Sequence, residues 1–171
     1  LVPPVAGGAT RQQSVRAGLE GLAEAGEPSF VLIHDAARPF VDRPLLDRAV
    51  AAVRTFGAAV PGIRVTDTIK VVDLDGAVRQ TPARESLRSV QTPQGFAFRP
   101  LLDAHRRAAE AGLDGFSDDG ALMEWAGLAV AVFEGDPRNV KITLPGDLEE
   151  AERRLGTGRF VTRIGTGFDV H

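Results

Sequence analysis

The sequence has no cysteine among its 171 residues. This absence excludes a disulfide framework and a thiolate nucleophile, and it fits a reducing cytoplasm, which is the compartment we expect. No run of about 18 apolar residues occurs, so we expect no membrane-spanning helix and no membrane partner. No signal-peptide pattern precedes the predicted domain.

Lysine is scarce as well. Lys70 and Lys141 are the only two lysines, and the other cationic side chains are arginines. A retained lysine is of interest because a compact ammonium has properties that a guanidinium lacks. The formal charge, 20 − 23 = −3, gives no general attraction to nucleic acid, which we do not expect as a partner. Any phosphate binding must therefore be local.

The remaining composition, 43% hydrophobic and 25% charged, is that of a globular domain. Helical periodicity predicts helices at 11–25, 44–56, 100–111, 118–126 and 147–155. Short apolar runs predict strands at 29–34, 57–65, 89–92, 128–135 and 140–143, and a two-stranded arm at 68–73 and 77–81. Strands that alternate with helices favour an α/β three-layer sandwich with a mostly parallel sheet and a projecting β-arm.

The stretch VLIHDAARPF, residues 31–40, ends a buried strand on titratable side chains. Ligands of such sheets bind beyond the carboxyl ends of the strands, so Asp35 is placed to hold a magnesium ion or substrate hydroxyls. It can equally cap the turn or pair with Arg38, which is itself either a phosphate ligand or a surface ion-pair partner. We interpret His34 as a structural residue.

Three further stretches carry candidates whose structural and functional interpretations both stay open. GGATRQQS (7–14) puts a glycine pair before a helix, where Gly8 and Ser14 either approach a nucleotide or only form a turn and a cap. NVKIT (139–143) contains Lys141, and TPARESL (81–87) contains Arg84; each is a phosphate ligand or a surface cation. SDDG (117–120) is most simply an incomplete capping box led by Ser117, and the alternative is that its acids ligate a metal.

Taken in order, these stretches resemble one family. GGATRQQSVRAGL, VLIHDAARPF, VTDTIKVV, QTPQGF, SDDGALME and EGDPRNVKIT are similar to 2-C-methyl-D-erythritol 4-phosphate cytidylyltransferases of the non-mevalonate isoprenoid pathway, over roughly residues 5–155. The resemblance implies a Rossmann-like nucleotidyltransferase domain at 1–155, with an arm at about 66–91 that interlocks two subunits as a homodimer. It implies a reaction of CTP with methylerythritol phosphate, with Mg²⁺, that releases pyrophosphate.

The resemblance also implies roles for individual residues. Gly8 and Ser14 would hold the cytidine portion of the nucleotide, and Asp35, Ala36 and Arg38 would line its junction with the sugar phosphate. The last group would bind and orient methylerythritol phosphate: Thr68, Arg84, Lys141 and, where the family usually has threonine, Ser117. Arg84 and Lys141 would be the catalytic pair. Thr68 and Arg84 would serve the neighbouring subunit's site if the arms exchange.

A glycine-rich loop that binds the CTP triphosphate lies upstream of these motifs in the family. We therefore expect the 171-residue chain alone to have little transferase activity and to expose an apolar sheet edge.

TRIGTGFDVH (162–171) resembles the opening of 2-C-methyl-D-erythritol 2,4-cyclodiphosphate synthase, a zinc lyase of the same pathway. On that resemblance Asp169 and His171 are metal ligands, and because they are two positions apart on a strand, their side chains share one face. Residues 156–161 would be a linker. The parent protein would then be a bifunctional fusion. Two alternatives stay open for the transferase: a cytidylyltransferase for another polyol phosphate such as ribitol phosphate, and a non-catalytic dimerisation module.

Overall fold

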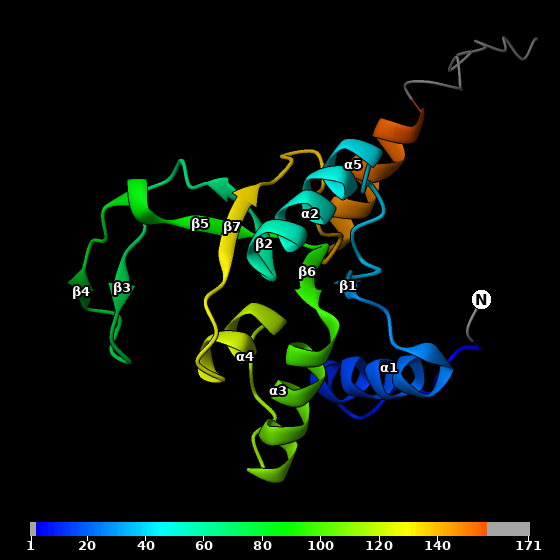
Figure 1. The fold of residues 1–171 in the computed structure, drawn as a ribbon. Helices are drawn as coiled ribbons and strands as arrows, with labels where there is room; N and C mark the ends of the chain where they lie inside the picture. The colour runs from blue at the N-terminus through cyan, green and yellow to red at the C-terminus, as the bar shows by residue number, and fades with distance from the viewer. Residues whose placement is uncertain (1–2, 157–171) are drawn as a thin grey trace, which may run out of the picture.

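The computed structural model describes residues 3–156, in which a mixed five-stranded sheet lies between two groups of helices (Figure 1). The strand order is β1 (Phe30–Ile33), β6 (Gln94–Ala97), β2 (Ala58–Arg64) and β5 (Arg88–Val90), and β7 (Ala131–Glu134) also pairs with β2. β7 is parallel to β2, whereas β6 is antiparallel to both of its neighbours and β5 is antiparallel to β2. Three of the five strands of this sheet, β1, β2 and β7, thus share one direction. The expected Asp169 and His171 lie outside the described residues.

Helices cover both sides of this sheet. α2 (Arg43–Phe56) packs on β2, β6 and β7, and α5 (Pro145–Gly156) lies beside it in Figure 1. α1 (Arg11–Gly26), α3 (Phe98–Glu110) and α4 (Asp119–Trp125) lie on the other side. All five predicted helices are confirmed to within two residues at each end. The three-layer α/β prediction follows from the same patterns and is also confirmed.

Local chemistry explains where these helices begin and end. The Asp42 carboxylate accepts a hydrogen bond from the Leu45 amide at 3.0 Å and so caps the first turn of α2. Gly57 ends the same helix with a φ of 77°, a left-handed conformation that glycine adopts without strain. Both signals stand in the sequence, and for that reason the bounds of this helix were predictable.

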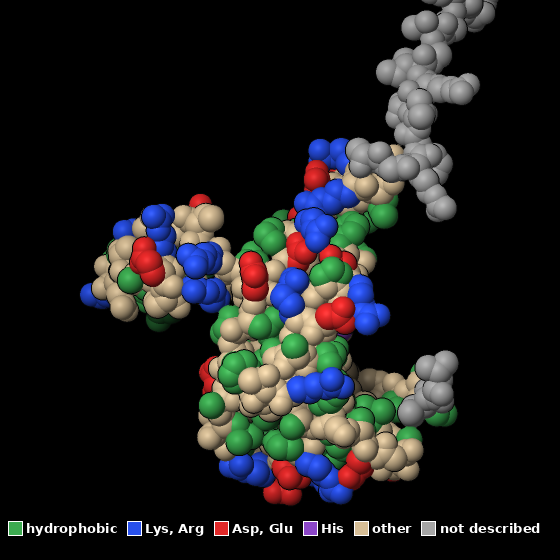
Figure 2. Space-filling view, turned by 45° about the horizontal axis from the view of Figure 1, so that its top comes forward, with side chains coloured by type: hydrophobic (Ala, Val, Ile, Leu, Met, Phe, Trp, Pro, Cys, Tyr) green, Lys and Arg blue, Asp and Glu red, His purple; other side chains and the backbone are tan. Residues whose placement is uncertain are grey.

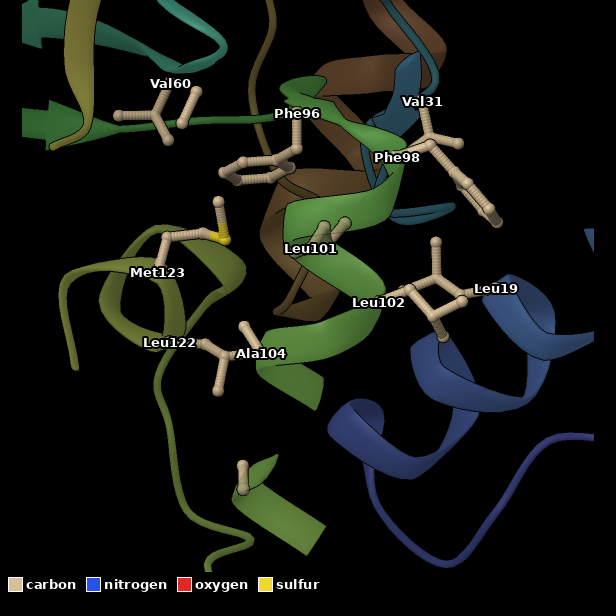
Figure 3. Packing of buried hydrophobic residues seen from close by; sticks show 12 residues of the cluster. Leu19, Val31, Val60, Phe96, Phe98, Leu101, Leu102, Ala104, Leu122 and Met123 are labelled. Carbon is tan, nitrogen blue, oxygen red and sulfur yellow. The ribbon is translucent and has the colours of Figure 1, made fainter. Parts of the chain in front are cut away.

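The core is built mainly from β6 and the helices on its side of the sheet (Figure 3). Phe96 of β6 and Phe98 at the start of α3 are fully buried, and burial of each such side chain contributes on the order of 2 kcal/mol. They pack in one cluster with Leu19 of α1 and Leu122 and Met123 of α4. This packing holds α1 and α4 against the strand ends, where the candidate residues lie.

One predicted strand is absent and one observed strand was not predicted. Residues 140–143 form no strand; their backbone is tied to the turn after β1 by a hydrogen bond from the Ile142 amide to the Ala37 carbonyl, at 2.8 Å. Strand β6 was not predicted, because Gln94 and Gly95 interrupt its apolar pattern. A Cβ atom on Gly95 would lie 3.1 Å from Val53 Cβ and 3.2 Å from Leu32 Cδ2, so close packing against α2 explains the glycine.

The arm is a separate two-stranded sheet of β3 (Val71–Val72) and β4 (Val78–Gln80), followed by a 3₁₀ turn, η1 (Arg84–Ser86). It stands away from the body of the molecule as a lobe in Figure 2, with Lys and Arg side chains on its surface. The predicted extent, 66–91, is too long, because residues 88–90 form β5 and pair with Gly62–Arg64 of the main sheet. The arm therefore leaves and rejoins the sheet through paired strands.

Candidate active site

A pocket of about 190 Å³ opens where the carboxyl end of β1 meets α1, α4 and the segment around residue 141. Larger hollows lie elsewhere on the described surface, but this pocket collects the predicted charged side chains. Its lining residues are Arg11, Asp35, Arg38, Val90, Gln91, Thr92, Gln94, Ser117, Asp118 and Lys141. Four of the predicted site residues, Asp35, Arg38, Ser117 and Lys141, are thus brought together from distant parts of the chain.

Asp35 lies between two cations. Lys141 Nζ donates a hydrogen bond to Asp35 Oδ2 at 3.0 Å, and Arg11 Nε lies 3.5 Å from Asp35 Oδ1. Burial alone raises the pKa of Asp35, but the hydrogen bond and charge of Lys141 and the charge of Arg11 outweigh it, so the pKa falls below its ordinary value. Asp35 is accordingly an anion at neutral pH.

Arg38 is half-buried and lies in the same turn as Asp35, where its amide donates to the Asp35 carbonyl at 3.0 Å. Its Nη1 donates to the Asn139 carbonyl at 2.9 Å, while its Nε is buried and has no hydrogen-bond partner in the described structure. Burial lowers the pKa of Arg38, and the charge of Asp35 partly opposes that shift. A guanidinium nevertheless stays protonated at physiological pH, so Arg38 contributes a positive charge to the pocket.

His34 fixes the turn that presents Asp35 and Arg38. The Asp35 amide donates to Thr92 Oγ1 at 3.0 Å, so the Thr92 hydroxyl has its own proton available for His34 Nδ1, 3.0 Å away. His34 Nε2 then carries the ring proton and donates it to the Arg38 carbonyl at 3.0 Å. Although the histidine is exposed, both ring nitrogens are paired, which agrees with the structural interpretation of His34.

Gly8 and Ser14 meet in the loop before α1. The Gly8 amide donates to Ser14 Oγ at 3.1 Å, and the Ser14 hydroxyl donates to the Thr10 carbonyl at 2.9 Å. A Cβ atom on Gly8 would come within 2.4 Å of Gln13 Cβ, so only glycine fits here. Neither residue lines the pocket around Asp35; they form a preorganised loop at the helix N-terminus.

Ser117 does not cap α4, which corrects that prediction. Asp118 is the N-cap: its Oδ1 accepts from the Ala121 amide at 2.7 Å, and its Oδ2 accepts from Gln94 Nε2 at 2.8 Å. An aspartate caps a helix as well as a serine does, so the tandem SDDG pattern could not assign the cap by itself. Ser117 is exposed at the pocket wall, with its hydroxyl side chain available to a ligand.

The other predicted residues lie apart from the pocket. Ala36 is exposed within the turn, Thr68 is exposed in the arm, and Arg84 stands in η1, where its Nη1 donates to the Thr66 carbonyl at 3.4 Å. Thr68 and Arg84 are not among the lining residues of the pocket in this single chain. Within one chain they therefore do not share a pocket with Asp35 and Lys141. Only the arm of another subunit would bring a Thr68 and an Arg84 to that pocket.

Sequence reasoning missed Arg11, Gln94 and Asp119. Arg11 lines the pocket and contacts both Asp35 and Asp119, which is almost fully buried at the start of α4. Each missed residue belongs to a motif that carried the resemblance: GGATRQQS, QTPQGF or SDDG. The signal was present as a residue type beside a predicted one, but nothing in the spacing showed that the three motifs converge.

The profile of the family described as IspD, 2-C-methyl-D-erythritol 4-phosphate cytidylyltransferase, matches residues 2–157. The chain belongs to the 2-C-methyl-D-erythritol 4-phosphate cytidylyltransferase family. This is a family of nucleotidyltransferases in isoprenoid biosynthesis, and the Rossmann-like fold expected from the sequence is confirmed by its solved members. One is the cytidylyltransferase from Thermus thermophilus, with a TM-score of 0.77 and 42% identity, covering 90% of this chain and 76% of that one.

Two further similarities concern bifunctional proteins. A protein of Nitrobacter winogradskyi named bifunctional enzyme IspD/IspF is 60% identical over 169 residues, which are 99% of this chain and 42% of that protein. The structure of the bifunctional IspDF from Campylobacter jejuni gives a TM-score of 0.69 at 27% identity, covering 85% of this chain and 36% of that one. The chain thus spans about two-fifths of the length of its curated relatives. Among the residues that the structure describes, 3–156, no helix is long and apolar enough to cross a membrane.

Proposed function

We propose that the protein containing this chain transfers a cytidylyl group from CTP to 2-C-methyl-D-erythritol 4-phosphate and releases pyrophosphate. The observation that carries the proposal is the convergence of Arg11, Arg38 and Lys141 around Asp35 in one pocket, in a chain of the cytidylyltransferase family. Three cations meet two lining carboxylates, Asp35 and Asp118, and a third carboxylate, the buried Asp119, pairs with Arg11. Arg38 and Lys141, the two cations that Asp119 does not hold, suit a phosphate-bearing substrate in a protein whose overall charge is negative.

The chemistry needs no activated serine or cysteine, because the nucleophile is a phosphate oxygen of the substrate. Catalysis then consists of aligning two polyanions and stabilising the charge that builds up at the α-phosphorus. Lys141 and Arg38 supply that stabilisation on the sugar-phosphate side. Asp35 keeps the Lys141 ammonium in place before the substrate arrives, and the Ser117 hydroxyl offers one further hydrogen bond at the pocket wall.

Asp35 is also the residue that fits a magnesium ion. The described residues contain no group of three or more His, Cys, Asp or Glu side chains arranged for a metal. Magnesium is commonly held by one or two carboxylates together with substrate phosphates, so a single half-buried carboxylate suits that mode. The ion would neutralise phosphate charge; in the described chain, Asp35 would supply the carboxylate and Lys141 would give up part of its contact with it.

We further propose that two copies of the chain form a homodimer through the arm. The arm exposes apolar side chains that a solitary two-stranded sheet cannot bury: Ile69, Val71, Val72, Leu74 and Val78. Thr68 and Arg84 would then complete the substrate site of the neighbouring subunit. Replacement of Val72 by glutamate is expected to give monomers in size-exclusion chromatography with light scattering, and an unchanged dimer would refute the arm interface.

The names of the curated relatives support a bifunctional parent protein, and we propose a transferase domain at 1–155, a linker at 156–161 and a cyclodiphosphate synthase after it. We also propose that this protein lies in the cytoplasm. On this proposal Asp169 and His171 are ligands of a divalent metal, Zn²⁺, in that second domain.

The test uses the full-length protein. Supplied with CTP, Mg²⁺ and methylerythritol phosphate, it is expected to release pyrophosphate at a rate that depends on both substrates. Ribitol phosphate serves as the matched control substrate, because it offers a similar polyol phosphate with a different backbone. Equal rates with ribitol phosphate would assign the alternative substrate, and no release with either would leave the chain as a dimerisation module.

A further inference from the structure

A continuous series of paired side chains runs from the interior of the protein to Asp35. His105 of α3 and Asp119 of α4 share a hydrogen bond of 2.9 Å between Nε2 and Oδ1. Asp119 Oδ2 forms an ion pair of 2.8 Å with Arg11 Nη2 at the start of α1. Arg11 Nε in turn lies 3.5 Å from Asp35 Oδ1. Three helices are therefore connected to the site by one set of contacts.

Asp119 is costly to bury. Its side chain is 2% exposed and that of His105 is 0% exposed, so water can solvate neither. A carboxylate in such surroundings is tolerated only when it is paired: here Oδ1 shares a hydrogen bond with His105, and Oδ2 has the ion pair with Arg11 but no hydrogen bond. Asp119 thus fixes the direction of the Arg11 guanidinium, since rotation of that group away from it would leave a buried charge without a partner.

The guanidinium geometry matters because Arg11 contacts two carboxylates at once. Its Nη2 faces Asp119 and its Nε faces Asp35, an arrangement that a planar group with several donors allows and a single ammonium does not. Arg11 occupies one oxygen of Asp35, and the other oxygen is left to Lys141 at 3.0 Å. The position of Lys141 therefore depends on Arg11 through Asp35.

We propose that Arg11 and Asp119 are positioning residues for the cytidylyltransferase reaction, which hold Asp35 so that Lys141 is set for the substrate phosphate. This inference rests on the proposed function and adds to it. When the phosphate enters, Lys141 exchanges Asp35 for a phosphate oxygen, and Asp35 stays in place because Arg11 still holds it. Without Arg11 or Asp119, the carboxylate is free to rotate and to keep Lys141 away from the phosphate.

Two variants of the full-length protein test this in different ways. Arg11→Lys keeps a positive charge beside Asp119 at a position that is 37% exposed, so the fold is retained, but it cannot bridge two carboxylates. Asp119→Asn removes the charge that orients Arg11. Each is expected to lower kcat about tenfold or more, with a smaller rise in KM for methylerythritol phosphate, as misplacement of a catalytic group does.

Because both residues act as one unit, the double variant Arg11→Lys/Asp119→Asn is expected to have a kcat no lower than that of the less active single variant. The matched control is Asp47→Asn, which breaks the exposed ion pair between Asp47 and Arg43 on α2 and leaves the site untouched. Multiplied losses in the double variant, or wild-type kcat in folded Arg11→Lys, would overturn the proposal.

A second measurement does not depend on turnover. Reductive methylation with ¹³C gives each lysine an NMR signal and preserves its charge, and the signal of Lys141 is identified by its loss in Lys141→Arg. We expect this signal to shift in Arg11→Lys and Asp119→Asn but not in Asp47→Asn. An unshifted Lys141 signal would refute the positioning role. A shifted signal in a protein that releases no pyrophosphate would instead refute the proposed function alone.

Discussion

Lys141 Nζ lies 3.0 Å from Asp35 Oδ2, although 106 residues separate them in the sequence. The contact exists because the Ile142 amide donates to the Ala37 carbonyl at 2.8 Å and ties the segment after Asn139 to the turn after β1. Two motifs that are individually weak thereby form one pocket. The pairing of these residues is the basis of the first prediction.

Lys141→Ala is expected to lower kcat/KM for methylerythritol phosphate by a factor of about 100 or more, because the phosphate loses its ammonium partner in the transition state. The unfolding midpoint should stay close to that of the wild type, since the Lys141–Asp35 pair is partly exposed and contributes about 1 kcal/mol or less. Lys70→Ala is the matched control, because Lys70 donates to Thr81 in the arm. Equal losses in both variants would remove Lys141 from the mechanism.

Arg84→Ala is expected to abolish turnover although Arg84 lies outside the pocket of its own chain, because in the proposed dimer the arm serves the neighbouring subunit. The two inactive variants Arg84→Ala and Lys141→Ala are then mixed after dissociation and reassembly. Half of the dimers are mixed, and each mixed dimer has one intact site, so about a quarter of the wild-type activity should return. If Arg84 acts in its own subunit, no mixed site is intact and the mixture stays inactive.

Gly8→Ala is expected to weaken CTP binding by about tenfold, because the new methyl group would displace Gln13 and the Ser14 hydroxyl that the loop holds. Isothermal titration with CTP measures the change. Gly18→Ala, in the helix that follows this loop, is the control, since its Cβ would meet nothing within 4 Å and helix propensity improves by about 1 kcal/mol. Unchanged CTP affinity in a folded Gly8→Ala protein would place the nucleotide elsewhere.

Asp136 gives the chain a pH-dependent contribution to stability. Hydrogen bonds from Arg138 lower the pKa of Asp136 from 3.8 to about 2. Because the unfolded state takes up the proton first, this contribution is present above the unfolded pKa and is lost as the pH falls through about 2. Urea midpoints at about pH 7 and about pH 3 should therefore differ less in Asp136→Asn than in the wild type. An equal difference in both proteins would show that Asp136 is not the group responsible.

Much of the fold was predictable because its signals are local. An N-cap aspartate, an apolar stripe and a terminal glycine predict the helix from Arg43 to Phe56. Strand β6 was missed because Gly95 is required by the packing of α2, a constraint that arises only after the chain has folded. The predicted strand at 140–143 failed for the same reason: its residues bond to a turn instead of to a strand edge.

The candidate site also has residues that the sequence predicted and residues that it did not. Asp35 and Arg38 were predictable because a strand end followed by a rigid turn delivers side chains to the ligand edge of an α/β sheet. Arg11 and Asp119 were not, because each is ordinary in its own motif. Only the packing of α1 against α3 and α4 brings a buried carboxylate to Arg11 and Arg11 to Asp35.

The sequence by itself determined the order of helices, the end of β1 and the set of candidate phosphate ligands, since periodicity, caps and residue chemistry act over a few neighbours. The tertiary structure alone decided which of those side chains share a pocket, and it placed Arg84 and Thr68 on an arm away from it. The physical reason is that contacts between residues about a hundred positions apart depend on how sheet and helices pack, and no short-range preference encodes that packing.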